Sequence, residues 1–141
     1  MCIRDSFWAD FDLRRGGDIY YRQTAQRDIL EQIAFFVSRA GGFQFQPTLA
    51  FIVTWDGVPA FNGRFQGLTN TFQAILATDG TYSFVGVVYR NIQWAGSVQI
   101  GLNAGDGRGY STPLTISDIL GNRLGSNIMI PGAYLWRTDS K

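Results

Sequence analysis

The chain has 141 residues, of which 45 % are hydrophobic, 15 % aromatic and only 16 % charged, which suits one domain with a buried core and excludes a disordered chain. The formal net charge is +1 and eleven of the twelve basic residues are scattered arginines, so nothing favours nucleic acid or an anionic membrane as a partner. Histidine is absent and Cys2 is the only cysteine, which excludes an internal disulfide, a Cys/His metal cage and histidine-based catalysis. No apolar run reaches the roughly 20 residues of a membrane span.

The N-terminal part is expected to hold two short strands and one helix. The strands lie in Phe7–Gln23, joined by an Arg-Arg-Gly-Gly turn whose glycines can adopt positive φ. From Arg27 onward, apolar residues recur at the spacing of one helical face, namely Ile29, Leu30, Ile33, Phe36, Val37 and Ala40. Asp28 at the start and Arg39 near the end suit the helix dipole, and Gly41 is the expected stop.

The middle of the chain has the composition of β-strands. Thr48–Trp55 is β-branched and aromatic, and Asp56-Gly57 is expected to end that strand. A loop over Ala60–Asn70 leads to Thr71–Arg90, where Asp79-Gly80 between two strand-like runs predicts a β-hairpin.

The predicted hairpin is apolar on both faces. A two-residue turn would place Thr78 opposite Thr81 and Phe72 opposite Val87. One face then carries Phe72, Ala74, Leu76, Val85 and Val87, and the other carries Ile75, Ala77, Tyr82, Phe84 and Val88. The hairpin is therefore expected at the centre of a sheet that is covered on both sides.

The C-terminal part is also expected to be β-rich. A strand is predicted over Ser97–Leu102, then a glycine-rich loop over Asn103–Ser111, a short strand at Leu114–Ile116 and a last strand at Ala133–Thr138. The predicted fold class is mainly β with one amphipathic helix (α+β), as an antiparallel sheet or sandwich.

Carboxylates are the only residues that could carry catalysis or bind a metal. Asp10 and Asp12, on one face of a strand, would lie roughly 7 Å apart, as a metal site or a glycosidase pair needs. Bonds to backbone amides or to Arg14 and its neighbour are the favoured alternative. Asn103 and Asp106 lie in the glycine-rich loop but lack the spacing and closing Glu of an EF-hand. Asp10, Asp12 and Asp106 remain weak metal candidates, and we expect neither a metal nor a cofactor.

The segments of the chain follow an order that resembles one known family. They are "FWADFD", "GDIYYR", a helix, "FIVTWDGVPAF", "NTFQAILATDGTYSFVGVVYRNIQW", "GLNAGDG" and "SNIMIPGAYLWRTD". From Phe7 to about Asp139 this order resembles the NIDO domain, the extracellular domain named after nidogen and also found in tectorin and some membrane mucins.

The resemblance implies a non-enzymatic extracellular adhesion module that contacts matrix or cell-surface proteins. Such modules belong to larger mosaic proteins, with EGF-like and von Willebrand type D neighbours in some relatives. The family supplies no catalytic residue to carry over. The positions that match its pattern are read as fold determinants: Trp8, Asp10, Asp12, Trp55, Asn70, Phe72, Gln73, Asp79, Gly80, Ser126, Asn127, Pro131 and Gly132.

The first six residues, "MCIRDS", depart from the family pattern, in which further strands precede the "FWADFD" segment. Met-Cys-Ile-Arg-Asp-Ser is encoded by ATG TGT ATA AGA GAC AG plus one base, which resembles a transposase end sequence used in sequencing libraries. We therefore expect residues 1–6 to be a non-native leader and residues 7–141 to be a partial NIDO domain without its first strands. The charged N-terminus then says nothing about a signal peptide, and an extracellular location is expected. Loss of those strands is expected to leave an open sheet edge or an exposed apolar face, and Phe7–Lys141 expressed alone is expected to aggregate.

A second hypothesis is a carbohydrate-binding β-sandwich, with or without assistance from calcium held by Asp10, Asp12 or Asp106. Trp8, Trp55, Trp94 and Trp136 could form an aromatic platform for sugar. Each lies in or beside a predicted strand, so packing within the sheet or core is their favoured role.

Overall fold

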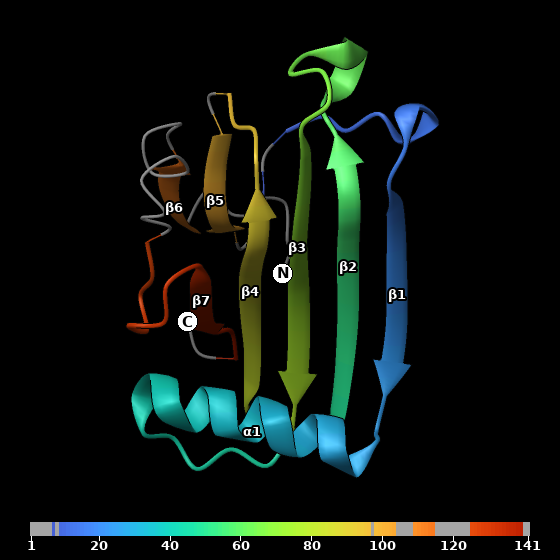
Figure 1. Ribbon diagram of the computed structural model, residues 1–141. Coiled ribbons are helices and arrows are strands. Elements are labelled where there is room, and N and C mark those ends of the chain that lie inside the picture. The colour runs from blue at the N-terminus through green and yellow to red at the C-terminus, as the bar shows by residue number, and fades with distance from the viewer. Residues whose placement is uncertain (1–6, 8, 97, 104–108, 115–124, 140–141) are drawn as a thin grey trace.

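The computed structural model describes residues 7, 9–96, 98–103, 109–114 and 125–139. A five-stranded antiparallel sheet has the order β1-β2-β3-β4-β7, and β5 and β6 form a separate pair. Figure 1 shows helix α1 crossing one end of the large sheet, with β1 as its outermost strand. The elements are η1 (Leu13–Arg15), β1 (Asp18–Thr24), α1 (Arg27–Gly41), β2 (Leu49–Pro59), η2 (Phe61–Gly63), β3 (Thr69–Thr78), β4 (Ser83–Ile92), β5 (Val98–Asn103), β6 (Gly109–Leu114) and β7 (Ala133–Arg137).

The predicted fold class is confirmed, because the described residues form mostly antiparallel sheet with one α-helix. The helix is where its apolar spacing predicts it, and it buries Ile33 and Val37. Its stop lies one residue later than predicted. Gly41 is still helical, whereas Gly42 has φ 68° and donates its backbone N–H to the Ser38 carbonyl at 2.9 Å. The left-handed conformation that closes the last turn therefore falls on the second glycine.

The β3–β4 hairpin is at the centre of the sheet as predicted, but its predicted register is wrong. Thr78 pairs with Ser83, and Phe72 pairs with Tyr89 instead of Val87. The turn is longer because the Asp79 carboxylate accepts the backbone N–H groups of both Thr81 and Tyr82, at 2.8 and 2.7 Å. The shift is two residues, so the strand residues keep the predicted faces. Tyr82, predicted on a strand face, lies in the turn.

The first predicted strand is absent from the described residues. The segment before η1 is irregular, with a single β-bridge between Phe11 and Ala60. The second predicted strand is β1. Its entry is fixed by Gly17, which has φ 74° and lies so close to the neighbouring strand that a Cβ there would be 2.5 Å from the Gly57 carbonyl oxygen. Only glycine fits this crossing.

Strand β2 is longer than predicted. It passes through Asp56-Gly57 to Pro59, with a shift in register against β3 between Trp55 and Val58. Gly57 has φ 61°, and its N–H is bonded to the Thr71 hydroxyl at 3.0 Å instead of continuing the ladder. Asp56-Gly57, the predicted end of the strand, therefore forms an irregularity within it.

The next predicted loop and short strand are also misplaced. Asn103 belongs to β5, and Gly109–Leu114 form β6, so the strand begins within the predicted loop and ends at the first residue of the predicted strand. Residues 104–108 and 115–124 lie outside the described part. The last strand, β7, matches its prediction apart from one residue.

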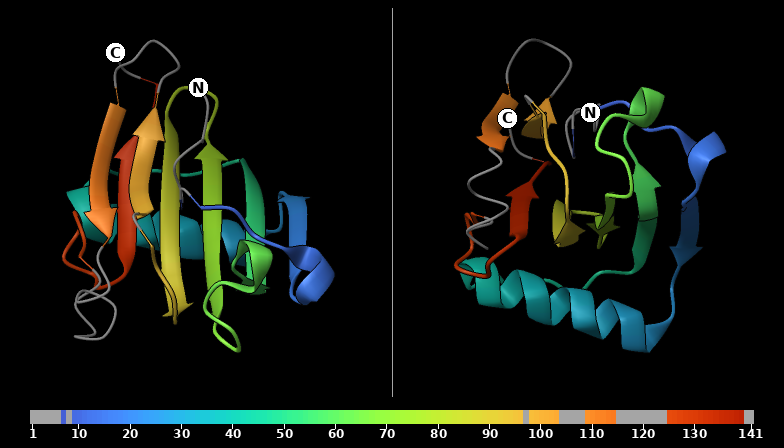
Figure 2. Two further views of the ribbon diagram at one scale, coloured as in Figure 1. Left: turned by 90° about the horizontal axis from the view of Figure 1, so that it is seen from above. Right: turned by 45° about the horizontal axis from the view of Figure 1, so that its top comes forward.

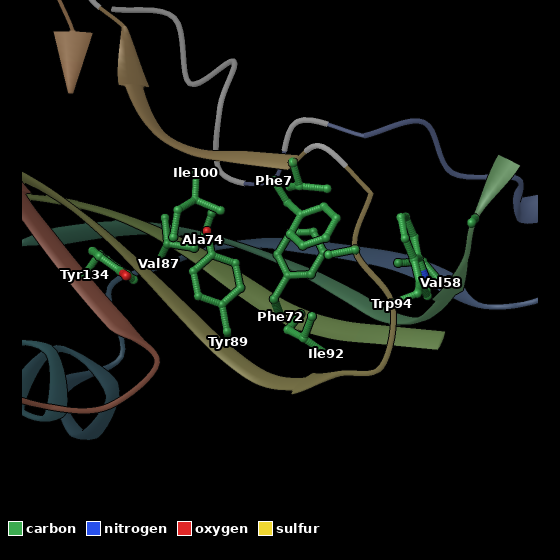
Figure 3. Packing of buried hydrophobic residues seen from close by; sticks show 13 residues of the cluster. Phe7, Val58, Phe72, Ala74, Val87, Tyr89, Ile92, Trp94, Ile100 and Tyr134 are labelled. Carbon is green, nitrogen blue, oxygen red and sulfur yellow. Dashed lines mark hydrogen bonds between the residues drawn. The ribbon is translucent and has the colours of Figure 1, made fainter. Parts of the chain in front are cut away.

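Two hydrophobic clusters cover the two faces of the sheet. On one face α1 packs its buried side chains against β2, β3 and β4, where Ile52, Ala77 and Phe84 lie. On the other, Phe7 and Ile100 lie over Phe72 and its neighbours (Figure 3). The central hairpin is therefore covered on both sides, as its two apolar faces predict.

Candidate functional site

The structure places the two predicted carboxylate candidates that it describes in different environments. Asp12 is buried at the start of η1, and its Oδ1 accepts a 2.7 Å hydrogen bond from Nε of Arg14. That hydrogen bond lowers the pKa of Asp12. Asp10 is exposed, and its backbone carbonyl accepts the N–H of Phe61 at 3.0 Å. The segment is not a strand, so the expectation that both carboxylates share a strand face is wrong.

No metal-binding cluster occurs in the part of the chain that the structure describes: no three His, Cys, Asp or Glu side chains come together there. Asp106 and Trp8 lie outside that part. None of the described helices has the length and apolarity that crossing a membrane requires.

The three described tryptophans take part in aromatic packing. Trp55 stacks on Phe72 with ring centroids 4.7 Å apart, and Trp136 stacks on Tyr134 at 5.6 Å. Trp94 is buried, and its indole N–H donates to the Val58 carbonyl at 3.3 Å. Their ring faces lie against other side chains.

Asn70 is a buried polar side chain with its hydrogen bonds satisfied. Its Oδ1 accepts the backbone N–H groups of Gln93 and Trp94 at 2.9 and 3.1 Å, and its Nδ2 donates to the Trp94 carbonyl at 2.9 Å. These bonds fix the chain where it leaves β4 and turns toward β5. The Asn70 side chain therefore holds the backbone in place, and both lone pairs of its Oδ1 are used by backbone N–H groups.

Ser126 and Asn127 hold the outer edge of β7. The Asn127 side chain donates to the Leu135 carbonyl at 2.7 Å and accepts the Leu135 N–H at 3.0 Å, as a paired strand would. The Ser126 hydroxyl donates to the Ala133 carbonyl at 2.7 Å. Gly132, with φ 76°, completes the turn into β7, and exposed Pro131 precedes it.

Two further family-pattern residues act locally. Gln73 donates through Nε2 to the Thr54 hydroxyl across the β2–β3 pair at 2.8 Å. Gly80, with φ 93°, follows Asp79 in the hairpin turn. The assignment of the whole set as fold determinants stays a prediction, and these contacts are its present support.

An exposed apolar area lies on the outer strands and involves residues that the sequence pattern did not single out. Six of the seven residues of β1 are exposed. Ile19 and Tyr21 are on the sheet face opposite α1, where they pair with Trp55 and Val53 of β2. Phe51 and Leu49 lie further along β2 on the same face and are also exposed. Tyr21 is 75 % exposed, and its ring centroid lies 6.0 Å from that of Phe51. We call Ile19, Tyr21, Leu49 and Phe51 the outer-strand patch.

The α1 side of β1 is polar. Asp18, Tyr20 and Arg22 alternate with the patch residues, and all three are exposed. The negative charge of Asp18 raises the pKa of the Tyr20 phenol, with smaller contributions from burial and from Asp56. Asp18 lies directly opposite Asp56 across the β1–β2 pair. The outer strand therefore has one apolar face and one charged face.

A cleft of about 820 Å³ lies elsewhere, between the N-terminal segment, η2 and the chain around Trp94. Asp10 and Arg64 provide its charged groups, and the Arg64 guanidinium lies 5.2 Å from the Phe65 ring centroid. One exposed carboxylate and one guanidinium do not form an acid–base pair at a reacting centre.

The fold defines a mainly β domain with a single helix among the described residues. The family assignment agrees with that class. Residues 5–140 match the model of the Nidogen-like domain, NIDO. The chain belongs to the NIDO family, whose members include domains of nidogen and tectorin, which are extracellular matrix proteins and not enzymes.

Several curated proteins resemble the chain. Human alpha-tectorin is 32 % identical over 157 aligned residues, which cover 96 % of this chain and 7 % of tectorin. Dendrite extension defective protein 1 of Caenorhabditis elegans is 33 % identical over 71 % of this chain and 9 % of its own length. Mouse nidogen-1 is 37 % identical over 59 % of this chain and 7 % of its own length. The chain thus spans less than a tenth of these relatives. No solved structure matches it significantly.

Proposed function

We propose that this chain is an extracellular adhesion module that binds matrix or cell-surface proteins through the outer-strand patch. Membership of the NIDO family carries the proposal, because the relatives named above include matrix proteins. As in those much longer relatives, the module would be one part of a mosaic protein. The division into a leader over residues 1–6 and a NIDO segment from Phe7 belongs to the same proposal.

The outer-strand patch has the composition of a protein-binding surface. Tyr21 and Phe51 are exposed aromatic residues in contact with each other, and Ile19 and Leu49 extend the apolar area. Contiguous exposed apolar residues on a folded domain mark interaction sites, and aromatic anchors dominate the energy of such interfaces. The cleft beside Trp94 has one exposed aromatic side chain, Phe61, whereas the outer-strand patch has two that contact each other.

The proposal is tested by binding of the full 141-residue chain to an array of purified matrix proteins and cell-surface ectodomains. Partners retained by the chain are then titrated with Tyr21→Ser and Phe51→Ser. We expect each to weaken binding roughly tenfold or more, as loss of a central aromatic anchor does.

Phe35→Ser is the matched control, because Phe35 is a 69 % exposed aromatic residue on α1, away from the patch. It should leave binding unchanged. Equal losses for all three variants, or no retained protein on the array, would contradict the proposed adhesion through this surface.

A further inference from the structure

Strand β1 is an edge strand of the sheet that the described residues form. Within the described residues it pairs only with β2, over seven consecutive residue pairs without a shift in register. Figure 1 shows α1 running from the end of β1 inward under the other strands, so the helix leaves the outer side of β1 uncovered. The strand contains no proline and no bulge that would interrupt pairing. Such an edge is a template for another strand.

The sequence of β1, Asp-Ile-Tyr-Tyr-Arg-Gln-Thr, is complementary to itself in one antiparallel register. A twofold axis at Tyr20 places Asp18 opposite Arg22 of a second copy, because both residues are two positions away from Tyr20. The same axis places Ile19 opposite Tyr21. Axes at Ile19 or Tyr21 would leave both charges opposite uncharged residues. Only the Tyr20 register brings opposite charges together on one face and apolar side chains together on the other.

The charges on β1 lack ionic partners within the described chain. Arg22 forms no ion pair among the described residues, although it is an exposed cation on a strand. Asp18 faces Asp56, a like-charged pair that is unfavourable across a β-ladder. Arg22 of a second copy would lie beside Asp18 and reduce that repulsion. Charge complementarity therefore favours a second copy of this chain over an uncharged strand as the occupant.

We propose that two copies of this chain associate edge to edge through antiparallel pairing of their β1 strands, centred on Tyr20. The result is a continuous sheet of ten strands, five from each copy. On one face two Asp18–Arg22 pairs cross the junction. On the other, Ile19 of each copy meets Tyr21 of the other, which joins the two outer-strand patches into one apolar surface. This inference goes beyond the proposed function, because it requires no matrix protein.

The test is a charge exchange in the full chain, followed by sedimentation equilibrium of purified protein. The unaltered chain should dimerise below about 100 µM, in the range of weak protein–protein association. Asp18→Arg brings two arginines together at each crossing, and Arg22→Asp brings two aspartates together. Each variant alone should raise the dimer dissociation constant roughly tenfold or more, since attraction becomes repulsion at two sites.

Mixing the two variants is the decisive arm. In the mixed dimer every crossing again pairs an acid with a base, so association should return to that of the unaltered chain. Both positions are exposed, so the variants should fold, and an unchanged thermal unfolding midpoint is the control. A chain that is monomeric at about 100 µM, or variants that associate equally alone and mixed, would overturn the proposal. Because no partner protein is present, this outcome is independent of the binding assay above.

Discussion

The two edges of the five-stranded sheet differ in whether side chains hydrogen-bond to their outward-facing backbone groups. At β7, Asn127 donates to and accepts from Leu135 at 2.7 and 3.0 Å, so a side chain occupies the place of a neighbouring strand. At β1, six of seven residues are exposed and the described structure provides no such cover. One edge is closed to further pairing and the other is available. The difference supports our proposal that the domain associates through β1.

Polar side chains hold the β7 edge of the sheet in place. The β1 edge instead carries an aromatic residue that is largely exposed to solvent. Asp139 accepts the Ser83 N–H at 2.8 Å and so ties the end of β7 to the start of the β4 strand. On β1, Tyr21 is 75 % exposed, and Phe51 of β2 is its one partner among the described aromatic contacts. Removing the first kind of residue should cost stability, and removing the second should cost association.

Ser126→Ala should have the largest effect on stability, because it opens the closed edge. The hydroxyl donates to the Ala133 carbonyl and accepts the N–H groups of Ile128 and Ile130 at 3.0 and 3.1 Å. Loss of three partly buried hydrogen bonds should lower the free energy of unfolding by about 3 kcal/mol, measured by denaturant titration. Ser38→Ala, at an exposed helical site, should change it by less than about 0.5 kcal/mol. Equal effects would show that Ser126 does not hold the edge.

A smaller effect is expected from acid. Hydrogen bonds from Arg137 and from the Ser83 backbone lower the pKa of Asp139 to about 2, below the value near 3.9 of an unfolded aspartate. The charged form is therefore favoured in the folded state, and its contribution to stability is complete above about pH 4 and is lost as the pH falls toward about 2. Asp139→Asn should flatten the fall of unfolding free energy over this interval. Identical pH profiles for both proteins would refute that role.

The helix and the central hairpin could be predicted from the sequence, because apolar spacing and an Asp-Gly pair are local signals. The register of the hairpin could not, because it depends on the Asp79 carboxylate binding two backbone N–H groups and lengthening the turn. The Phe7–Asp12 segment has the aromatic content of a strand, yet packs as an irregular segment with Phe7 buried over Phe72.

The outer-strand patch could not be predicted from the sequence either, because it depends on where β1 lies in the sheet. Aromatic and β-branched residues in a strand usually indicate burial, and Ile19 and Tyr21 resemble core residues until the position of β1 at the sheet edge is known. The hydrogen bonds of Asn70 and Asn127 are equally invisible, because they join residues 24 and 8 positions apart. Only the family pattern pointed to these two asparagines.

Figure 2 shows how far β1 stands from the C-terminal strands, with the sheet between them, so the two edges can be probed separately in one molecule. The most direct test is amide hydrogen exchange of the full chain at low and high protein concentration. If β1 pairs with a second copy, exchange of amides in Asp18–Thr24 should slow as concentration rises, while exchange in Ala133–Arg137 stays constant. Exchange in β1 that does not depend on concentration would contradict the assignment of β1 as the associating edge.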